Sequence, residues 1–422
     1  METNQNVEQV LSRPVKQKKK RGFWLGMFLG IFFTLVLVLA VYAGMMGYRY
    51  VQMMEAKKNA SETVVDTNMQ MKLQTIEQII DFYYYKDDLD KQVLEDGVYR
   101  GLLDAVGDPY TTYYSEAELK ELLEHTEGVY YGIGAYVALD SVTGLPKIAS
   151  AIPGTPAEAA DLRPDDIIYK VDGQEVYGMD LNAVTALIKG EEGTSVNLTI
   201  IRDGEIDYLS VDVVRRKVET PSVQSEMFED GMAYIQIVEF NEMTVPQFAD
   251  ALATAKGSDM KGLIIDLRAN PGGSLDAVVN IAQMLLPEGL VVYTEDKYGN
   301  REEYKCDGTK EFGYPLVVLI DGNSASASEI LAGSIQDYEV GTLVGTTTFG
   351  KGIVQQIITL ADQSAVKITV SSYYTPKGRD IHGVGISPDI VCEFDGNSYY
   401  NEGYDNQLER AKEVLGELID QQ

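Results

Sequence analysis

The chain has 422 residues, a length that favours two or more folded units. Its content of 45% hydrophobic and 24% charged residues is typical of a globular protein and excludes a largely disordered one. The formal net charge of −30 argues against a nucleic-acid partner, because phosphate binding needs a basic face.

The N-terminus combines a basic cluster with a long apolar run. Residues 1–21 carry six Lys and Arg side chains against two Glu, and residues 23–47 contain no charged side chain. About 20 apolar residues span a bilayer, and a flank rich in Lys and Arg stays in the cytoplasm. We therefore expect a single-pass anchor in the cytoplasmic membrane, with the N-terminus inside and the rest of the chain outside. The alternative is a cleaved signal peptide, because Val41-Tyr42-Ala43 before Gly44 offers small residues at a cleavage position.

The next part of the chain is predicted to be helical. Residues 48–70 are polar and indicate a stalk. Over residues 71–125 apolar side chains recur at spacings of three and four, which predicts helices. Ser115, with Glu118 three positions later, is expected to cap the last of them.

From residue 126 the pattern changes to short β-rich pieces separated by Gly, Pro and Asp, with one amphipathic helix near residues 181–189. Past Pro221 strands and helices alternate, which favours an α/β core. Buried strands predicted at residues 262–267 and 316–320 each end in a polar turn that is followed by a helix.

These two strand–turn–helix junctions carry candidate catalytic residues. Free N–H groups at a helix N-terminus can bind developing negative charge. Gly272 and Gly273 lie in the first junction, and Ser326 and Ala327 lie in the second. Taken alone, each motif is explained at least as well by a simple turn or by a serine that caps a helix.

Lys351 lies between Gly350 and Gly352 in apolar surroundings. A lysine can act as a general base only if burial lowers its pKa from about 10.4 towards neutrality. Gln355 would orient the amine without adding a charge. The rival base is His382, because histidine is the commoner partner of a nucleophilic serine. Residue types alone do not decide between Lys351 and His382.

Four segments, in this order along the chain, resemble the motif set of the carboxyl-terminal processing proteases, also called tail-specific proteases. They are residues 266–273, 324–330, 350–355 and 378–389, and the resemblance extends over about residues 70–400. It implies that Ser326 is the nucleophile, Lys351 the general base and Gln355 its orienting partner. It also implies an oxyanion hole formed by the amide of Gly272 or Gly273 together with that of Ala327. Asp337 matches a position sometimes counted with the charge-relay residues, although a structural role explains it equally well.

The β-rich region resembles the PDZ-like domain of these proteases, in which a peptide C-terminus is bound as an added strand. By this resemblance Gly132, Ile133, Gly134 and Ala135 form the carboxylate-binding loop. Val184, Leu187 and Ile188 are candidates for the hydrophobic groove, and core packing explains them equally well.

The expected fold class is a multidomain α/β protein with an N-terminal transmembrane helix, a helical segment, a PDZ-like β-rich domain and a crotonase/ClpP-like α/β protease core. The expected divisions are a cytoplasmic basic tail (1–22), a transmembrane anchor (23–47), a stalk (48–70), an N-terminal helical segment (71–125), a PDZ-like domain (126–217), a serine protease core (218–396) and a C-terminal helix (397–422).

The resulting hypothesis is a serine endopeptidase that binds protein C-termini and cleaves by a Ser–Lys–Gln mechanism outside the cytoplasmic membrane. Its expected partners are protein or peptide substrates with exposed C-termini, the membrane through the N-terminal helix, and further copies of the chain. The alternative is a catalytically silent PDZ-type scaffold. Metal-ligand spacings are absent, so no metal or organic cofactor is expected. Pairing of Cys306 with Cys392 stays open.

Overall fold

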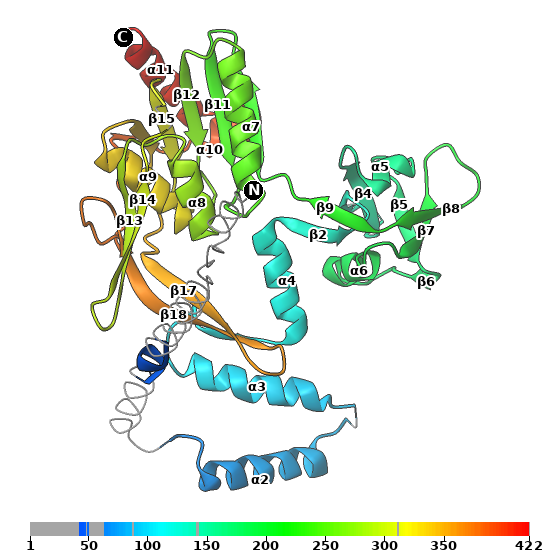
Figure 1. The fold of residues 1–422 in the computed structure, drawn as a ribbon. Helices are drawn as coiled ribbons and strands as arrows, with labels where there is room; N and C mark the ends of the chain where they lie inside the picture. Colours follow the sequence, from blue (N-terminus) through cyan, green and yellow to red (C-terminus); the bar gives the residue numbers. More distant parts are fainter. Residues whose placement is uncertain are drawn as a thin grey trace, which may run out of the picture. The chain divides into compact units, whose positions relative to one another are not determined.

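The computed structural model describes residues 42–47, 49, 63–86, 88–140, 143–309 and 312–421 (Figure 1). The chain divides into two compact units, residues 1–90 and 91–422, and each is described by itself. In the first unit, helix α2 (Thr67–Tyr83) begins after Asp66, whose side chain accepts a hydrogen bond from Met69 N at 2.8 Å. None of the residues of α2 is buried.

The predicted transmembrane helix over residues 23–47 is corrected by the structure. Among the described residues, no helix is both long enough and apolar enough to cross a bilayer. Residues 42–47 are helical, but residues 23–41 of the predicted anchor lie outside the described part, as do the predicted tail at 1–22 and much of the predicted stalk. The fold class of the described chain is therefore multidomain α/β without a spanning helix.

The second unit begins with two helices and a short strand, which are α3 (Lys91–Asp104), β1 (Thr112–Tyr114) and α4 (Glu116–Glu127). The predicted capping box at the start of α4 is confirmed. Ser115 N donates to the Glu118 carboxylate at 2.8 Å, and Glu118 N donates to Ser115 Oγ at 3.4 Å.

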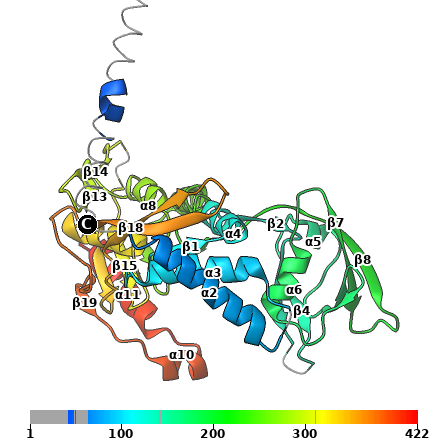
Figure 2. The same ribbon diagram turned by 90° about the horizontal axis from the view of Figure 1, so that it is seen from below.

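The β-rich region has its own sheet and its own core. Its elements are β3 (Ala135–Leu139), β4 (Pro146–Ala151), α5 (Pro156–Ala159), β5 (Ile167–Val171), β6 (Gln174–Glu175), α6 (Leu181–Ile188), β7 (Ser195–Ile201) and β8 (Leu209–Val214). The strand order is β3–β4–β5–β7–β8, with β6 beside β5, so β3 is an edge strand. Figure 2 shows α6 beside this sheet, and α6 buries Val184 and Ile188 in the core.

Two paired strands connect this region to the rest of the second unit. Strand β2 (Val129–Gly132) leads into it and β9 (Arg216–Glu219) leads out of it. They pair antiparallel, and Thr220 N donates to Gly128 O at 2.8 Å beside them.

The largest sheet is the centre of the α/β region. In spatial order it contains β10 (Val223–Met227), β11 (Met232–Ile237), β12 (Gly262–Asp266), β15 (Leu316–Ile320), β16 (Thr342–Gly345) and β19 (Ile390–Val391). All neighbours are parallel except β10 and β11. Because parallel sheets are covered on both faces, their strands are continuous apolar runs, as the sequence predicts for β12 and β15.

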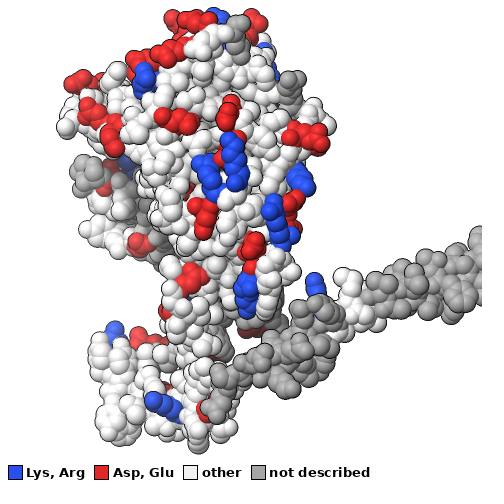
Figure 3. Space-filling model, turned by 90° about the vertical axis from the view of Figure 1, so that its left-hand side faces the viewer, with Lys and Arg blue, Asp and Glu red and all other residues white. Residues whose placement is uncertain are grey.

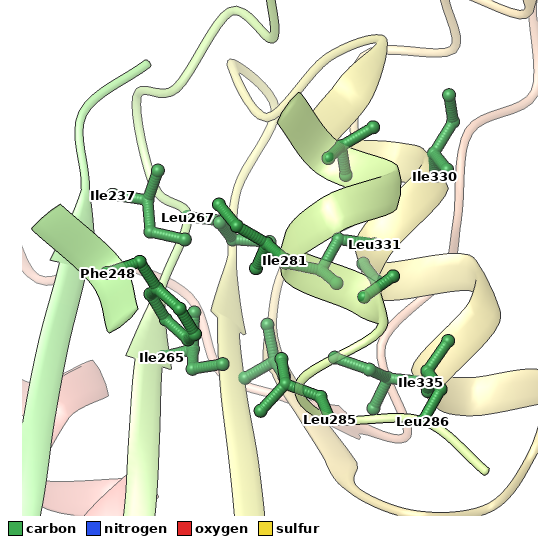
Figure 4. Packing of buried hydrophobic residues seen from close by; sticks show 14 of the residues in the cluster. Ile237, Phe248, Ile265, Leu267, Ile281, Leu285, Leu286, Ile330, Leu331 and Ile335 are labelled. Carbon is green, nitrogen blue, oxygen red and sulfur yellow. The ribbon is translucent and has the colours of Figure 1, made fainter. Parts of the chain in front are cut away.

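Helices cover both faces of this sheet. Helices α7 (Thr244–Gly257), α8 (Leu275–Ala282) and α9 (Ala327–Asp337) share one core with Ile265, and Figure 4 shows Ile281 and Leu331 near that strand residue. The neighbouring Ile264 points to the second core, which contains Leu415 of α11 (Asn406–Ile419). The predicted C-terminal helix is thus two helices, since α10 (Gly396–Glu402) precedes α11.

The sequence does not predict the second sheet of this region. Its order is β1–β18 (Ala365–Tyr374)–β13 (Gly289–Asp296)–β14 (Arg301–Cys306), and β17 (Ile353–Thr359) also pairs with β18. Strand β1 pairs with β18 in the register Thr112↔Lys367. Strand β1 precedes the β-rich region in the sequence, whereas all other strands of this sheet come after that region.

The face drawn in Figure 3 is of mixed charge, and both cysteines are free thiols. On the face drawn in Figure 3, Lys and Arg side chains lie among Asp and Glu, unlike the basic face that nucleic-acid binding needs. Cys306 and Cys392 are free thiols, and burial raises the pKa of Cys306 to about 11. Within the described ranges, no three His, Cys, Asp or Glu side chains gather as a metal site requires.

Candidate active site

Ser326 lies between strand β15 and helix α9, at the predicted junction. Its backbone has φ 52° and ψ −112°, a conformation that costs a residue other than glycine about 1–3 kcal/mol. Ser326 N donates to the Glu329 carboxylate at 2.8 Å. Ser326 O accepts hydrogen bonds from Ile330 N and from the Tyr373 hydroxyl, each at 3.0 Å. These bonds hold the strained turn that presents Ser326 at the start of the helix.

The three serines of this segment differ in their surroundings. The buried Ser324 hydroxyl donates to Leu267 O at 2.8 Å. The buried Ser328 hydroxyl donates to Asn270 O at 3.0 Å. Ser324 therefore fastens the loop before α9, and Ser328 the first turn of α9, to the segment after β12, whereas Ser326 lines an open cavity of about 570 Å³. Geometry alone thus separates Ser326 from the other two.

This cavity brings together predicted residues that are far apart in the sequence. Its wall includes parts of α4, the turn before α8, the start of α9, and strands β17 and β18. The predicted site residues that line it are Gly272, Gly273, Ser326, Ala327, Lys351 and Gln355.

The turn that contains Gly272 packs directly against the start of α9. A Cβ atom added to Gly272, at φ 101°, would lie 2.7 Å from Ser326 Cβ and 2.9 Å from Ala327 N. Gly272 N–H donates to the Asn270 side chain at 2.8 Å and is therefore occupied. No hydrogen bond of the described residues uses Gly273 N–H or Ala327 N–H. These two amides are thus the donors left to bind an oxyanion.

Lys351 is half-buried just before β17. Burial lowers the pKa of its ammonium group, and the positive charge of Lys367 lowers it further. Lys351 Nζ lies 4.4 Å from the centroid of the Tyr110 ring. Among the described residues, no hydrogen bond joins Lys351 Nζ to Ser326 Oγ. The structure therefore places the lysine in the same cavity as the serine but not in contact with its hydroxyl.

A buried carboxylate links the backbones of the serine and the lysine. Glu329, in the first turn of α9, is fully buried. Its Oε2 accepts hydrogen bonds from Ser326 N and Lys351 N, both at 2.8 Å. Its Oε1 accepts from Gly350 N at 2.7 Å and from the Thr348 hydroxyl at 2.6 Å. Each oxygen thus has two donors, which satisfies a charge that would otherwise be costly to bury.

Gln355 lines the cavity from strand β17, where the pairing with β18 is irregular at Val354 and Gln355. Its Nε2 donates to Ile353 O at 3.4 Å and to the Thr369 hydroxyl at 3.3 Å. In the described chain it makes no hydrogen bond to Lys351. The predicted orienting contact is therefore not formed in this arrangement.

The structure does not bring Asp337 or His382 to Ser326. Asp337 ends α9, about 16 Å along the helix from Ser326 at 1.5 Å per residue. Its carboxylate pairs with Arg379 at 2.6 Å and accepts from Lys377 N at 2.8 Å. His382 is exposed and does not line the cavity. Asp337 therefore holds a loop to the end of α9, and His382 packs against Gly352 without lining the cavity.

The predicted peptide-binding residues are divided between a cavity and the core. A second cavity, of about 210 Å³, lies between β3 and α6. Gly132, Ile133, Ala135 and Ile188 line it. Gly134, Val184 and Leu187 do not. Gly134 has φ 81°, and a Cβ atom there would lie 2.3 Å from Thr155 Cβ, while Val184 is fully buried in the core and Leu187 packs against it.

Sequence reasoning did not identify three residues that shape the site, namely Tyr110, Glu329 and Tyr373. The signal for Glu329 was its position three residues after Ser326, which is the spacing of a capping box. Tyr110 ends the segment Gly107-Asp-Pro-Tyr110, whose residues are typical of a turn and give no sign of a contact with Lys351. Tyr373 lies on a strand that the sequence did not reveal, and its hydroxyl lies within hydrogen-bonding distance of the backbone carbonyl oxygens of Ser326 and Lys351.

Two sequence profiles match the chain. The profile of peptidase family S41 matches residues 231–392, and that of the PDZ domain matches residues 147–202. The fold and the site thus define a serine-dependent hydrolase that carries a PDZ domain.

Relatives of similar sequence show to which family the chain belongs. The chain is 37% identical over 318 residues to the carboxy-terminal processing protease CtpA of Bacillus subtilis, over 75% of this chain and 67% of the relative. It is 37% identical over 330 residues to the carboxy-terminal-processing protease of Bartonella bacilliformis, over 76% of this chain and 74% of the relative. The chain belongs to peptidase family S41 and is a serine-type peptidase, as the resemblance implies.

A solved structure agrees at the level of the fold. The crystal structure of an S41 protease from Bacteroides fragilis aligns with a TM-score of 0.50 and 16% identity, over 85% of this chain and 100% of that chain.

Proposed function

We propose that this chain is an endopeptidase that binds protein C-termini through its PDZ domain and cleaves them with Ser326 as nucleophile and Lys351 as general base. The observation that carries the proposal is the shared cavity of Ser326, Lys351 and the unoccupied amides of Gly273 and Ala327. Burial of Lys351 supports its role, because it lowers the pKa of the ammonium group and so increases the fraction of neutral amine.

The proposed chemistry requires Lys351 Nζ to move from the Tyr110 ring to Ser326 Oγ. Neutral Lys351 Nζ removes the proton of Ser326 Oγ as this oxygen attacks the scissile carbonyl carbon. The amides of Gly273 and Ala327 stabilise the oxyanion. Lys351 then returns the proton to the leaving amine, and the acyl-enzyme is hydrolysed by a water that Lys351 deprotonates in turn. Gln355 orients the amine once Lys351 reaches Ser326.

Recognition of the substrate C-terminus is supported by the edge strand β3 and the cavity beside it. An edge strand has unpaired N–H and C=O groups to which a peptide can add as a further strand. Thr185 of α6 lines this cavity, so Thr185→Tyr is expected to fill it and raise KM about 10-fold for substrates with a free C-terminus. Asn182→Tyr, exposed on the same helix, is the matched control.

The catalytic test compares Ser326→Ala and Lys351→Ala with the wild-type enzyme. Both variants should lose peptide cleavage while keeping the wild-type circular dichroism spectrum. A serine-directed acylating probe should label the wild type at Ser326, and a catalytically silent scaffold would not be labelled. Cleavage by Lys351→Ala at the wild-type rate would refute the Ser–Lys mechanism.

We include two further features in the proposal. The catalytic region acts outside the cytoplasmic membrane, supported by a basic cluster followed by an uncharged run, the order found in export segments. Added protease should then degrade it in cells whose cytoplasmic membrane is intact. Copies of the chain self-associate, supported by the exposed apolar side chains Met71, Ile76, Ile79 and Phe82 of α2. Light scattering should then show a mass above 46.6 kDa.

A further inference from the structure

The ammonium group of Lys351 contacts the ring of Tyr110 and not the hydroxyl of Ser326. Its Nζ lies 4.4 Å from the centroid of the Tyr110 ring. A cation over an aromatic face is attracted by the negative potential of the ring, so this contact favours the protonated lysine. A general base must be unprotonated when it acts. The observed contact therefore stabilises a form of Lys351 that cannot take the proton of Ser326.

The backbone of Tyr110 is held by the turn in which it lies. Tyr110 N donates to Asp108 Oδ1 at 3.0 Å, and the Thr111 hydroxyl donates to Asp108 Oδ2 at 2.7 Å. Thr369 N, on β18, donates to Thr111 Oγ1 at 3.2 Å. Because β1 continues from this turn and also pairs with β18, the backbone that carries the Tyr110 ring is anchored to a sheet whose strands line the cavity.

The charged groups that act on Lys351 come from three other elements, and His382, which packs against Gly352 and interacts with Asp108, is a further titratable group beside them. Lys367 of β18 opposes the protonated form, whereas Asp108 of the turn and Glu329 of α9 favour it. Lys367 Nζ itself lies 2.9 Å from the Tyr114 hydroxyl. The protonation state of Lys351 is thus set by opposing contributions, so the loss of one contact changes it measurably.

We propose that Tyr110 is a positioning residue that holds the protonated Lys351 away from Ser326 in the resting enzyme, and that Lys351 becomes the general base only when it leaves this ring. This inference depends on the proposed role of Lys351 as the base. The segment before the PDZ domain would thus act on the proposed base directly, through the contact between Tyr110 and Lys351.

The test compares Tyr110→Phe, which keeps the ring, with Tyr110→Leu and Tyr110→Met, which keep apolar bulk without a ring. The readout is the pH dependence of kcat/KM for a fluorogenic peptide. In the Leu and Met variants the rise of kcat/KM with pH should move to lower pH, and kcat/KM on the acid side should increase about 3- to 10-fold over wild type. In the Phe variant the rise should stay at the wild-type pH.

The matched control is Tyr298→Leu. Tyr298 also carries a lysine over its ring, with Lys297 Nζ at 5.1 Å from the centroid, but it does not line the cavity. This variant should show the wild-type pH profile. Thermal unfolding of each variant identifies any that fails to fold, and the two aliphatic substitutions provide independent chances of a folded protein.

A second readout separates this inference from the mechanism on which it rests. Proteins labelled with ¹³C at lysine Cε, with Lys351→Arg to assign the signal, report the titration of Lys351 directly. An unchanged titration and pH profile in folded Leu and Met variants, or an equal change in the Phe variant, would overturn the role of Tyr110. Activity of Lys351→Ala would instead refute the Ser–Lys mechanism, whatever the titration shows.

Discussion

Glu329 and Lys351 are joined by a hydrogen bond of 2.8 Å from the Lys351 backbone amide to Glu329 Oε2, the oxygen that also accepts the Ser326 amide. One buried carboxylate therefore sets the distance between the backbones of the proposed nucleophile and base. Side-chain motion of Lys351, such as departure from the Tyr110 ring, leaves this backbone connection intact.

Glu329→Gln is expected to impair both stability and catalysis. A glutamine amide offers one acceptor oxygen and an NH₂ group, and the latter would face two donors. We expect the free energy of unfolding to fall by about 2–3 kcal/mol and kcat to fall about 10- to 100-fold, because the reacting groups are displaced. Urea unfolding and steady-state kinetics measure the two effects. Glu302→Gln, at an exposed position of β14, is the control, and wild-type kcat in Glu329→Gln would contradict the positioning role.

Lys367→Met should alter the pH profile in the opposite direction to Tyr110→Leu. Lys367 lowers the pKa of Lys351, so its removal raises that pKa. In the proposed mechanism activity requires neutral Lys351 and rises with pH through its pKa, so the rise should move to higher pH. On the acid side of the profile kcat/KM should fall about 3-fold. Lys305→Met on β14 provides the comparison, and a shift to lower pH would show that Lys351 is not the group being titrated.

Gly272→Ala should reduce kcat about 100-fold or more, because the added Cβ would lie 2.7 Å from Ser326 Cβ and displace this proposed nucleophile. Gly299→Ala is the control, because it introduces backbone strain without a steric contact. Gly299 also has positive φ, at 80°, but a Cβ atom there would meet nothing within 4 Å. Burst and steady-state measurements on both variants give the acylation rates. Equal losses in the two variants would mean that strain alone explains the effect.

Asp337→Asn should weaken the fold more than the chemistry. The Asp337 side chain is 3% exposed and pairs with Arg379, which is 39% exposed. Breaking this pair should lower the free energy of unfolding by about 2–3 kcal/mol, less than for a fully buried pair. Asp250→Asn, exposed on α7, serves as the reference. If kcat of the folded Asp337→Asn enzyme fell more than about 100-fold, a charge-relay role would be restored.

The sequence predicts those parts of the fold whose signals are local. Strands β12 and β15 are short apolar runs, and the capping box of α4 is a four-residue pattern. The second sheet was missed because β1 and β18 are joined by pairing between distant residues, such as Thr112 and Lys367. No local pattern around Lys367 indicates that partner.

The same reason explains what was found at the site and what was not. Ser326, Lys351 and Gly272 were identified because their motifs resemble a known family. Tyr110 reaches Lys351 only through the pairing of β1 with β18, so its role could not be read from the residues around it. The transmembrane helix was inferred from the absence of charge over residues 23–47, and no described helix supports it.

The hydrogen bond between Thr220 N and Gly128 O brings the two ends of the PDZ domain together. The chain departs from the peptidase region and returns to it at neighbouring points, so the PDZ domain has the geometry of an insert. Closely spaced ends allow a domain to be added or removed with little disturbance to its host. Replacing residues 129–219 by a turn of a few residues is therefore expected to leave both sheets of the peptidase region folded.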